Sequence, residues 1–199
     1  VVEDTNINCD DLNKPLSEIE VFEALRRLKN GKACGSDEIL SEMLKMSSDF
    51  SISFMTKLFN VLFNEGIYPQ EWSEAIIMPI FKKGDKTKTD NYRGISLLSI
   101  MSKCYTSVLN KRLMKWIELN CKLSESQAGF RKGYSTFDHI FTLSAIVEKC
   151  FSKKGGKLYA CFIDLKQAFD SVQREPLFET LIKNGIHGNA RHMDEHDNA

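Results

Sequence analysis

The sequence lacks the features that mark secreted, membrane-spanning and zinc-binding chains. Its six cysteines include no C-x-x-C pair and several stand among apolar residues, so we expect reduced core thiols rather than disulfides or zinc ligands. No apolar run approaches the ~20 residues that a membrane-spanning helix needs. No signal peptide opens the chain and no repeat appears. We therefore expect an intracellular protein, nuclear or cytoplasmic, that is not secreted and has no membrane partner.

Net charge is also lacking, because 27 basic side chains balance 27 acidic ones. The charges are unevenly spread, however. Residues 1–50 carry eleven acids against six bases, whereas residues 81–135 carry twelve bases against four acids. Aromatic residues are interleaved with the bases of the second window. A charge run is often only a solvated face, but this mixture favours contact with a nucleic-acid strand.

The apolar periodicity predicts a helix-rich α+β chain. A capping box at Ser17 and Glu20 begins a helix whose apolar face would be Ile19, Phe22, Leu25 and Leu28. Further helices are expected near 39–46, 52–64, 99–119, 137–151 and 175–183. Residues 75–81 form a strand candidate that leads into a polar, basic turn over 82–91.

A second strand candidate ends in a carboxylate. Leu158–Ile163 is a short apolar run, after a glycine turn, which predicts a buried strand. Asp164 follows directly and Phe169 comes five residues later. A carboxylate at the tip of a buried strand is costly unless a cation meets it, so a metal ion is a natural partner. The alternative is an aspartate that caps a turn.

Four blocks of sequence occur in a characteristic order. They are Pro79–Asp85 (PIFKKGD), Asn91–Leu98 (NYRGISLL), Gln127–Thr136 (QAGFRKGYST) and Tyr159–Asp170 (YACFIDLKQAFD). In this order they resemble the reverse transcriptase domain of non-LTR (LINE-type) retrotransposons, from about Leu16 to about Gly188. The resemblance implies an α+β fold with helix-rich fingers and an incomplete palm of a right-hand polymerase.

The resemblance also implies boundaries and partners. Residues 1–15 would be a flexible N-terminal segment, 16–157 the fingers with the template-gripping segment, 158–188 a partial palm, and 189–199 a disordered tail outside the family. The intact parent would be an RNA-directed DNA polymerase that extends a DNA primer on an RNA template with deoxynucleoside triphosphates and Mg²⁺.

Residue roles carry over position by position. Asp164 matches the first metal-binding, catalytic carboxylate. Lys82, favoured over Lys83, and Arg93 match the bases that clamp the triphosphate of the incoming nucleotide. Phe169 matches the steric gate that excludes a ribose 2′-hydroxyl. The template-gripping residues would be Gln127, Gly129, Phe130 and Arg131.

Two departures from the family pattern stand out. Residues 165–199 contain no aromatic-x-Asp-Asp turn to bring a second metal carboxylate, and no thumb follows, so we expect a fragment that is inactive alone. The tail holds His192-x-x-Glu195-His196, a metalloprotease pattern that we set aside. The alternatives are a non-catalytic RNA-binding or inert remnant, and another palm polymerase such as a group II intron maturase. The oligomeric state is left open.

Overall fold

A computed structural model describes residues 9–46, 49–165, 168–169 and 171–187. Its contacts divide the chain into two compact units. The large unit comprises Val1–Trp116 with Leu181–Ala199, and the small unit comprises Ile117–Thr180. The predicted tail, Asp170 and the first eight residues lie outside the described residues. Within the described part, no helix is both long and apolar enough to cross a bilayer.

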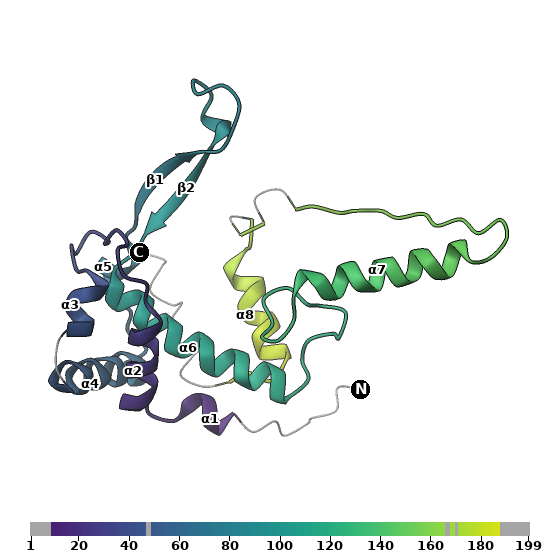
Figure 1. Ribbon diagram of the computed structural model, residues 1–199. Helices are drawn as coiled ribbons and strands as arrows, with labels where there is room; N and C mark the ends of the chain where they lie inside the picture. The colour runs from purple at the N-terminus through teal and green to yellow at the C-terminus, as the bar shows by residue number, and fades with distance from the viewer. Residues whose placement is uncertain (1–8, 47–48, 166–167, 170, 188–199) are drawn as a thin grey trace. The chain divides into compact units, whose positions relative to one another are not determined.

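Helices make up most of the large unit (Figure 1). They are α1 Asp10–Asn13, α2 Glu18–Arg27, α3 Ser41–Met46, α4 Asp49–Glu65, α5 Gln70–Ser73 and α6 Ile100–Leu119, whose last residues belong to the small unit. The helices predicted after Ser17 and near 39–46, 52–64 and 99–119 are confirmed, whereas α1 and α5 were not predicted. Met55 and Phe59 of α4 meet Tyr105 and Val108 of α6 in the buried core. Such close-packed apolar burial supplies most of the stability of these helices.

The buried face of α2 differs from the predicted one. Val21, Ala24 and Leu25 are buried, whereas Ile19 is 71% exposed. The capping box between Ser17 and Glu20 forms as expected. The carboxylate of Glu20, however, faces α6, and residues three and four apart share a helix face. This orientation turns Ala24 inward together with Glu20 and leaves Ile19 in solvent.

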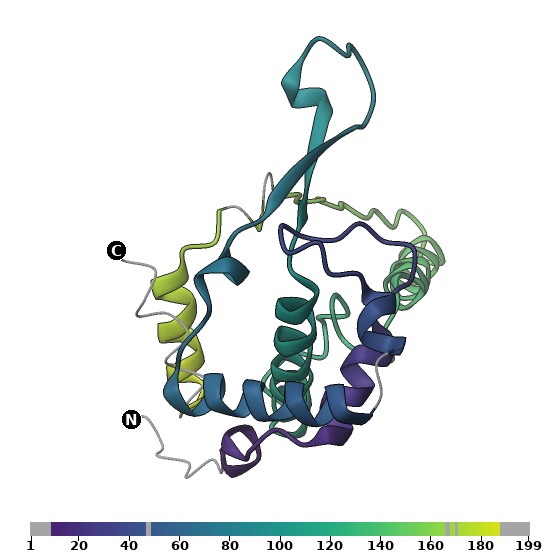
Figure 2. The same cartoon turned by 90° about the vertical axis from the view of Figure 1, so that its left-hand side faces the viewer.

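The sheet of the described residues is a single hairpin. β1 Ile76–Phe81 pairs antiparallel with β2 Tyr92–Leu97, with Ile76 opposite Leu97 and Phe81 opposite Tyr92. A 3-10 turn, η1 Thr89–Asn91, precedes β2. The hairpin projects away from the helices of its unit in both views (Figures 1 and 2). The strand predicted over 75–81 is therefore confirmed.

The small unit lacks the second predicted strand. Helix α7 Thr136–Phe151 begins at a capping box of Ser135 and Asp138, and α8 Arg174–Lys183 starts here and ends in the large unit. Between them, the segment 158–163 forms no ladder, and Tyr159 is 87% exposed. The prediction of a buried strand is wrong for this structure. A strand is stable only beside a partner edge, and β1 and β2 pair only with each other.

All six cysteines are free, as expected, but they are not all core thiols. Cys104 is fully buried, and burial raises the pKa of its thiol to about 12. Cys121 and Cys161 are exposed. The prediction of core thiols therefore fails at these two positions.

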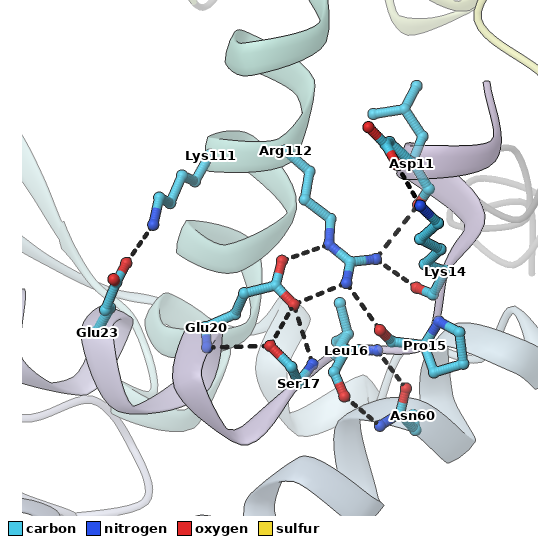
Figure 3. Close-up of polar contacts among 11 residues, drawn as sticks. Asp11, Lys14, Pro15, Leu16, Ser17, Glu20, Glu23, Asn60, Lys111 and Arg112 are labelled. Carbon is cyan, nitrogen blue, oxygen red and sulfur yellow. Dashed lines mark hydrogen bonds and ion pairs between the residues drawn. The ribbon is translucent and has the colours of Figure 1, made fainter. Parts of the chain in front are cut away.

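A partly buried ion pair joins α6 to the beginning of α2 (Figure 3). Arg112 Nε donates to Glu20 Oε1 over 2.6 Å, and its Nη2 donates to Glu20 Oε2 over 2.7 Å. The same guanidinium donates to the carbonyls of Lys14 and Pro15. These hydrogen bonds satisfy a charged group whose side chain is only 11% exposed, which makes the pair favourable despite its desolvation.

This pair gives the first prediction. Glu20→Gln removes the charge from the pair and should lower the unfolding free energy by about 2 kcal/mol, as expected for hydrogen bonds between charged groups. Glu23→Gln is the matched control, because its ion pair with Lys111 is far more exposed, and its loss should change the unfolding free energy much less than the loss of the Glu20 charge. Urea denaturation followed by circular dichroism measures both.

The same ion pair predicts how the unfolding free energy changes at low pH. Hydrogen bonding from Arg112 lowers the pKa of Glu20 from 4.5 to about 2. A depressed carboxyl pKa stabilises the fold fully above about pH 4.5, and this stabilisation is lost as the pH falls towards 2. The loss of stability between these pH values should therefore be shallower in Glu20→Gln. If the unaltered protein and Glu20→Gln lost the same unfolding free energy between pH 4.5 and 2, the lowered pKa of Glu20 would be contradicted.

Candidate functional site

The hairpin places two of the predicted triphosphate bases on one face. Ile80 lies opposite Arg93 in the ladder, and Lys82 N donates to Asn91 O over 2.8 Å, which extends the pairing by one residue on each strand. Side chains alternate between the faces of a strand, so Lys82 and Arg93 share a face. Both side chains are exposed. Lys83 lies beyond the pairing, one residue out of phase with Lys82.

The tip of the hairpin is held by hydrogen bonds of its own. Asn91 Nδ2 donates to Asp85 O over 2.8 Å, and the Tyr92 hydroxyl donates to Lys86 O over 3.0 Å. Asp85 accepts from the backbone and hydroxyl of Thr87, which lowers the pKa of Asp85. The basic side chains are thus presented from a defined turn.

The predicted template segment is a loop built around a buried arginine. The side chain of Arg131 is 6% exposed. Its Nε and Nη2 donate to the two oxygens of Glu118 over 2.9 and 2.8 Å. Its Nη1 donates to the carbonyls of Ser124 and Gln127 over 3.0 and 3.4 Å. The guanidinium also lies 4.3 Å from the centre of the Tyr134 ring.

The electrostatics of this loop follow from the same contacts. The hydrogen bonds from Arg131 lower the pKa of Glu118, and those bonds raise the pKa of Arg131. The Tyr134 hydroxyl donates to Glu125 over 2.7 Å, which raises the pKa of Tyr134. All three side chains therefore keep their usual charge state near neutral pH, and the loop stays tied to the end of α6.

Phe130 stands out from this loop in a strained conformation. Its backbone φ is +63°, a left-handed value that costs a bulky side chain about 1–2 kcal/mol. Its ring is 85% exposed. The neighbouring Gly129 is also exposed, and a Cβ added there would meet nothing within 4 Å.

Phe130 meets the predicted steric gate. The rings of Phe130 and Phe169 pack edge to face, with centroids 6.1 Å apart and planes at 87°. The structure therefore brings together two residues that the sequence assigned to different blocks. Asp164 lies on the exposed extended segment of the same unit.

Comparison with known proteins identifies the family of the segment that contains the hairpin turn, the Arg131 loop and Asp164. The reverse transcriptase (RNA-dependent DNA polymerase) family matches residues 80–193, more than half of the chain. The chain belongs to the reverse transcriptase family. The match includes the hairpin turn, the Arg131 loop and Asp164.

Individual relatives agree with this family. The chain is 31% identical to the probable RNA-directed DNA polymerase from transposon BS of Drosophila melanogaster, over 85% of this chain and 19% of that protein. It is 32% identical to that from transposon X-element of the same organism, over 79% and 17%. It is 29% identical to the RNA-directed DNA polymerase from mobile element jockey, over 81% and 18%. This reverse transcriptase chain thus spans about a fifth of the length of these curated relatives, and the resemblance to non-LTR retrotransposon polymerases is confirmed.

The described residues of this reverse transcriptase chain do not by themselves form a metal centre. No group of three histidine, cysteine, aspartate or glutamate side chains lies close enough together among them to hold an ion. Asp164 alone supplies one carboxylate, whereas Mg²⁺ prefers several oxygen ligands. The assignment of Asp164 to a metal therefore stays a prediction, and no catalytic step is drawn through it.

The structure reduces the number of bases in residues 81–135 that are available to contact nucleic acid. Among the described residues, the bases of this window that pair with acids include Lys111 with Glu23, Arg112 with Glu20 and Arg131 with Glu118. The window is therefore not one continuous nucleic-acid face. The hairpin segment 82–93 keeps five bases against two acids, so it is the stronger candidate for phosphate contact.

Sequence reasoning missed the residues that support these positions. Glu118, Ser124 and Tyr134 position Arg131, and Asn91 holds the hairpin tip. An acid and a base thirteen residues apart across a loop carry no periodic signal, so the Glu118–Arg131 pair was not visible in the sequence. Asparagine is common in turns, so Asn91, which precedes β2, was a weak sequence signal for the hairpin tip.

The hairpin tip gives the second prediction. Gly84 has φ +94°, and a Cβ there would lie 2.9 Å from the Asn91 side chain. Gly84→Ala should therefore loosen the turn, and the amide of Lys82 should exchange its hydrogen about tenfold faster. Lys83→Ala in the same turn is the control and should leave that exchange unchanged. Exchange measured by NMR checks both, and equal protection in Gly84→Ala would show that the turn tolerates a side chain.

Proposed function

We propose that this chain is the part of a retrotransposon RNA-directed DNA polymerase that holds the incoming deoxynucleotide and the RNA template. The observation that carries the proposal is the common face of Lys82 and Arg93 on the hairpin. Two exposed cations on one face suit a triphosphate, whose charge must be neutralised for nucleotidyl transfer. The division into fingers over 16–157 and partial palm over 158–188 belongs to this proposal.

The other residues have roles around the same nucleotide. Phe169 would lie beneath the sugar, where its ring leaves no room for a 2′-hydroxyl. Asp164 would supply one carboxylate to Mg²⁺ in the intact enzyme, whose ion would neutralise charge on the reacting phosphates. Gln127, Gly129 and Phe130 would contact the template. Arg131 is different, because its donors already have partners within the protein.

The third prediction separates Lys82 from Lys83. In an active polymerase that carries residues 16–188 of this chain in place of the matching residues of the jockey enzyme, Lys82→Ala should raise the KM for deoxynucleotides about tenfold. A lost phosphate contact worth about 1.4 kcal/mol gives this factor. Lys83→Ala, out of phase with Arg93, should change the KM less than about twofold. Steady-state primer extension measures both values.

The controls keep the outcome interpretable. Lys29, which follows α2, and Lys57, on α4, are exposed lysines of the large unit, and replacing both by alanine should leave the KM unchanged. A Lys82→Ala enzyme with an unaltered KM would show that the hairpin bases are a solvated face. A chimaera that extends no primer before any substitution would count against the polymerase assignment itself.

The fourth prediction tests the gate. In the same enzyme, Phe169→Val should reduce the preference for deoxynucleotides over ribonucleotides at least about tenfold, mainly through better use of ribonucleotides. The exposed ring of Phe169 buries little surface, so the melting temperature should change by less than about 2 °C. An equal loss of both activities together with a lower melting temperature would identify Phe169 as an ordinary packing residue.

A further inference from the structure

Arg131 and Phe130 are adjacent in sequence but opposite in exposure. The guanidinium is almost fully buried against Glu118 and the carbonyls of Ser124 and Gln127. The Phe130 ring is almost fully exposed, on a backbone with a left-handed φ. A bulky residue keeps such a conformation only where its surroundings impose it.

The contacts of Arg131 supply that constraint. Its two hydrogen bonds to Glu118 tie residue 131 to the end of α6, and its bonds to Ser124 and Gln127 close the loop on the other side of Phe130. The Arg131 backbone N–H also donates to Ala128 O over 3.4 Å, across Phe130 itself. The turn around Phe130 is therefore held on both sides by hydrogen bonds of Arg131.

Resting on the proposed function, we propose that Arg131 is a positioning residue that, through Glu118, holds the Phe130 ring outward to stack on an unpaired base of the RNA template. Exposed aromatic rings bind single-stranded nucleic acid by stacking, and arginine binds it through phosphates. Here the guanidinium is buried and makes four hydrogen bonds within the protein, whereas Phe130 is 85% exposed. The base-stacking role therefore goes to Phe130 and the supporting role to Arg131.

The test compares binding of a fluorescein-labelled single-stranded RNA over a range of salt concentrations. Phe130→Ala should raise the Kd about tenfold, because stacking on one base is lost. Arg131→Gln and Glu118→Gln should each raise the Kd about fivefold, and the double variant should be no weaker than either single one, since the two residues act as a unit. In all four variants the slope of log Kd against log salt should stay unchanged.

Glu118→Gln distinguishes the two possible roles of Arg131. If Arg131 positions Phe130, this substitution weakens RNA binding. If Arg131 bound phosphate, Glu118→Gln would release the guanidinium and tighten RNA binding, and Arg131→Gln would reduce the salt slope by about 0.7. Either result would overturn the proposal. Glu148→Gln, which removes one exposed acid from α7, controls for charge alone and should leave the Kd within about twofold.

Two further measurements separate a loss of folding from a loss of RNA binding. Circular dichroism melting of each variant shows that it is folded at the binding temperature. A folded Glu118→Gln with a lower melting temperature but an unchanged Kd would mean that the pair only stabilises the loop, and would overturn the positioning role. An unaltered chain that binds no RNA would overturn the proposed template contact as well as this inference.

Discussion

The large unit depends on the contact of the Arg112 guanidinium with the Glu20 carboxylate. Arg112 lies on α6, and Glu20 is also the third residue of the capping box of α2. The Glu20 carboxylate thus accepts the backbone N–H of Ser17 at the start of α2 and neutralises the partly buried Arg112 at the same time. Because the same guanidinium binds the carbonyls of Lys14 and Pro15, the chain before α2 is held as well. Removal of either partner would leave the other charge partly buried without its counter-ion.

The same arrangement recurs in the small unit with different residues. Arg131 binds Glu118 through two parallel hydrogen bonds and satisfies backbone carbonyls with its remaining donors. In both cases a planar fork of donors meets a carboxylate and a turn of backbone, which arginine does and lysine does not. The result is a loop whose shape is set by one side chain, and in the small unit that loop carries Phe130.

A buried cluster of apolar side chains distinguishes the large unit from the small one. The large unit has a core in which Phe59, Tyr105 and Trp72 pack at tilted or perpendicular ring angles. In the small unit, α7 buries none of its residues although its apolar content is high, and Phe162 and Ile163 are exposed on the extended segment. Local signals such as the capping box at Ser135 are therefore enough to define a helix that buries none of its side chains in the part of the chain that the structure describes.

The sequence alone determined the helices, the hairpin and the family, because caps, glycine turns and apolar periodicity act over a few residues. The capping box at Ser17, the end of α4 at Gly66 and the turn after Phe81 were all readable in this way. Tertiary structure decided the rest. It turned α2 so that Val21 rather than Ile19 is buried, left Leu158–Ile163 without a strand partner, and buried Arg131 against Glu118. A strand and a buried ion pair exist only through partners distant in sequence, and no local pattern specifies where those partners lie.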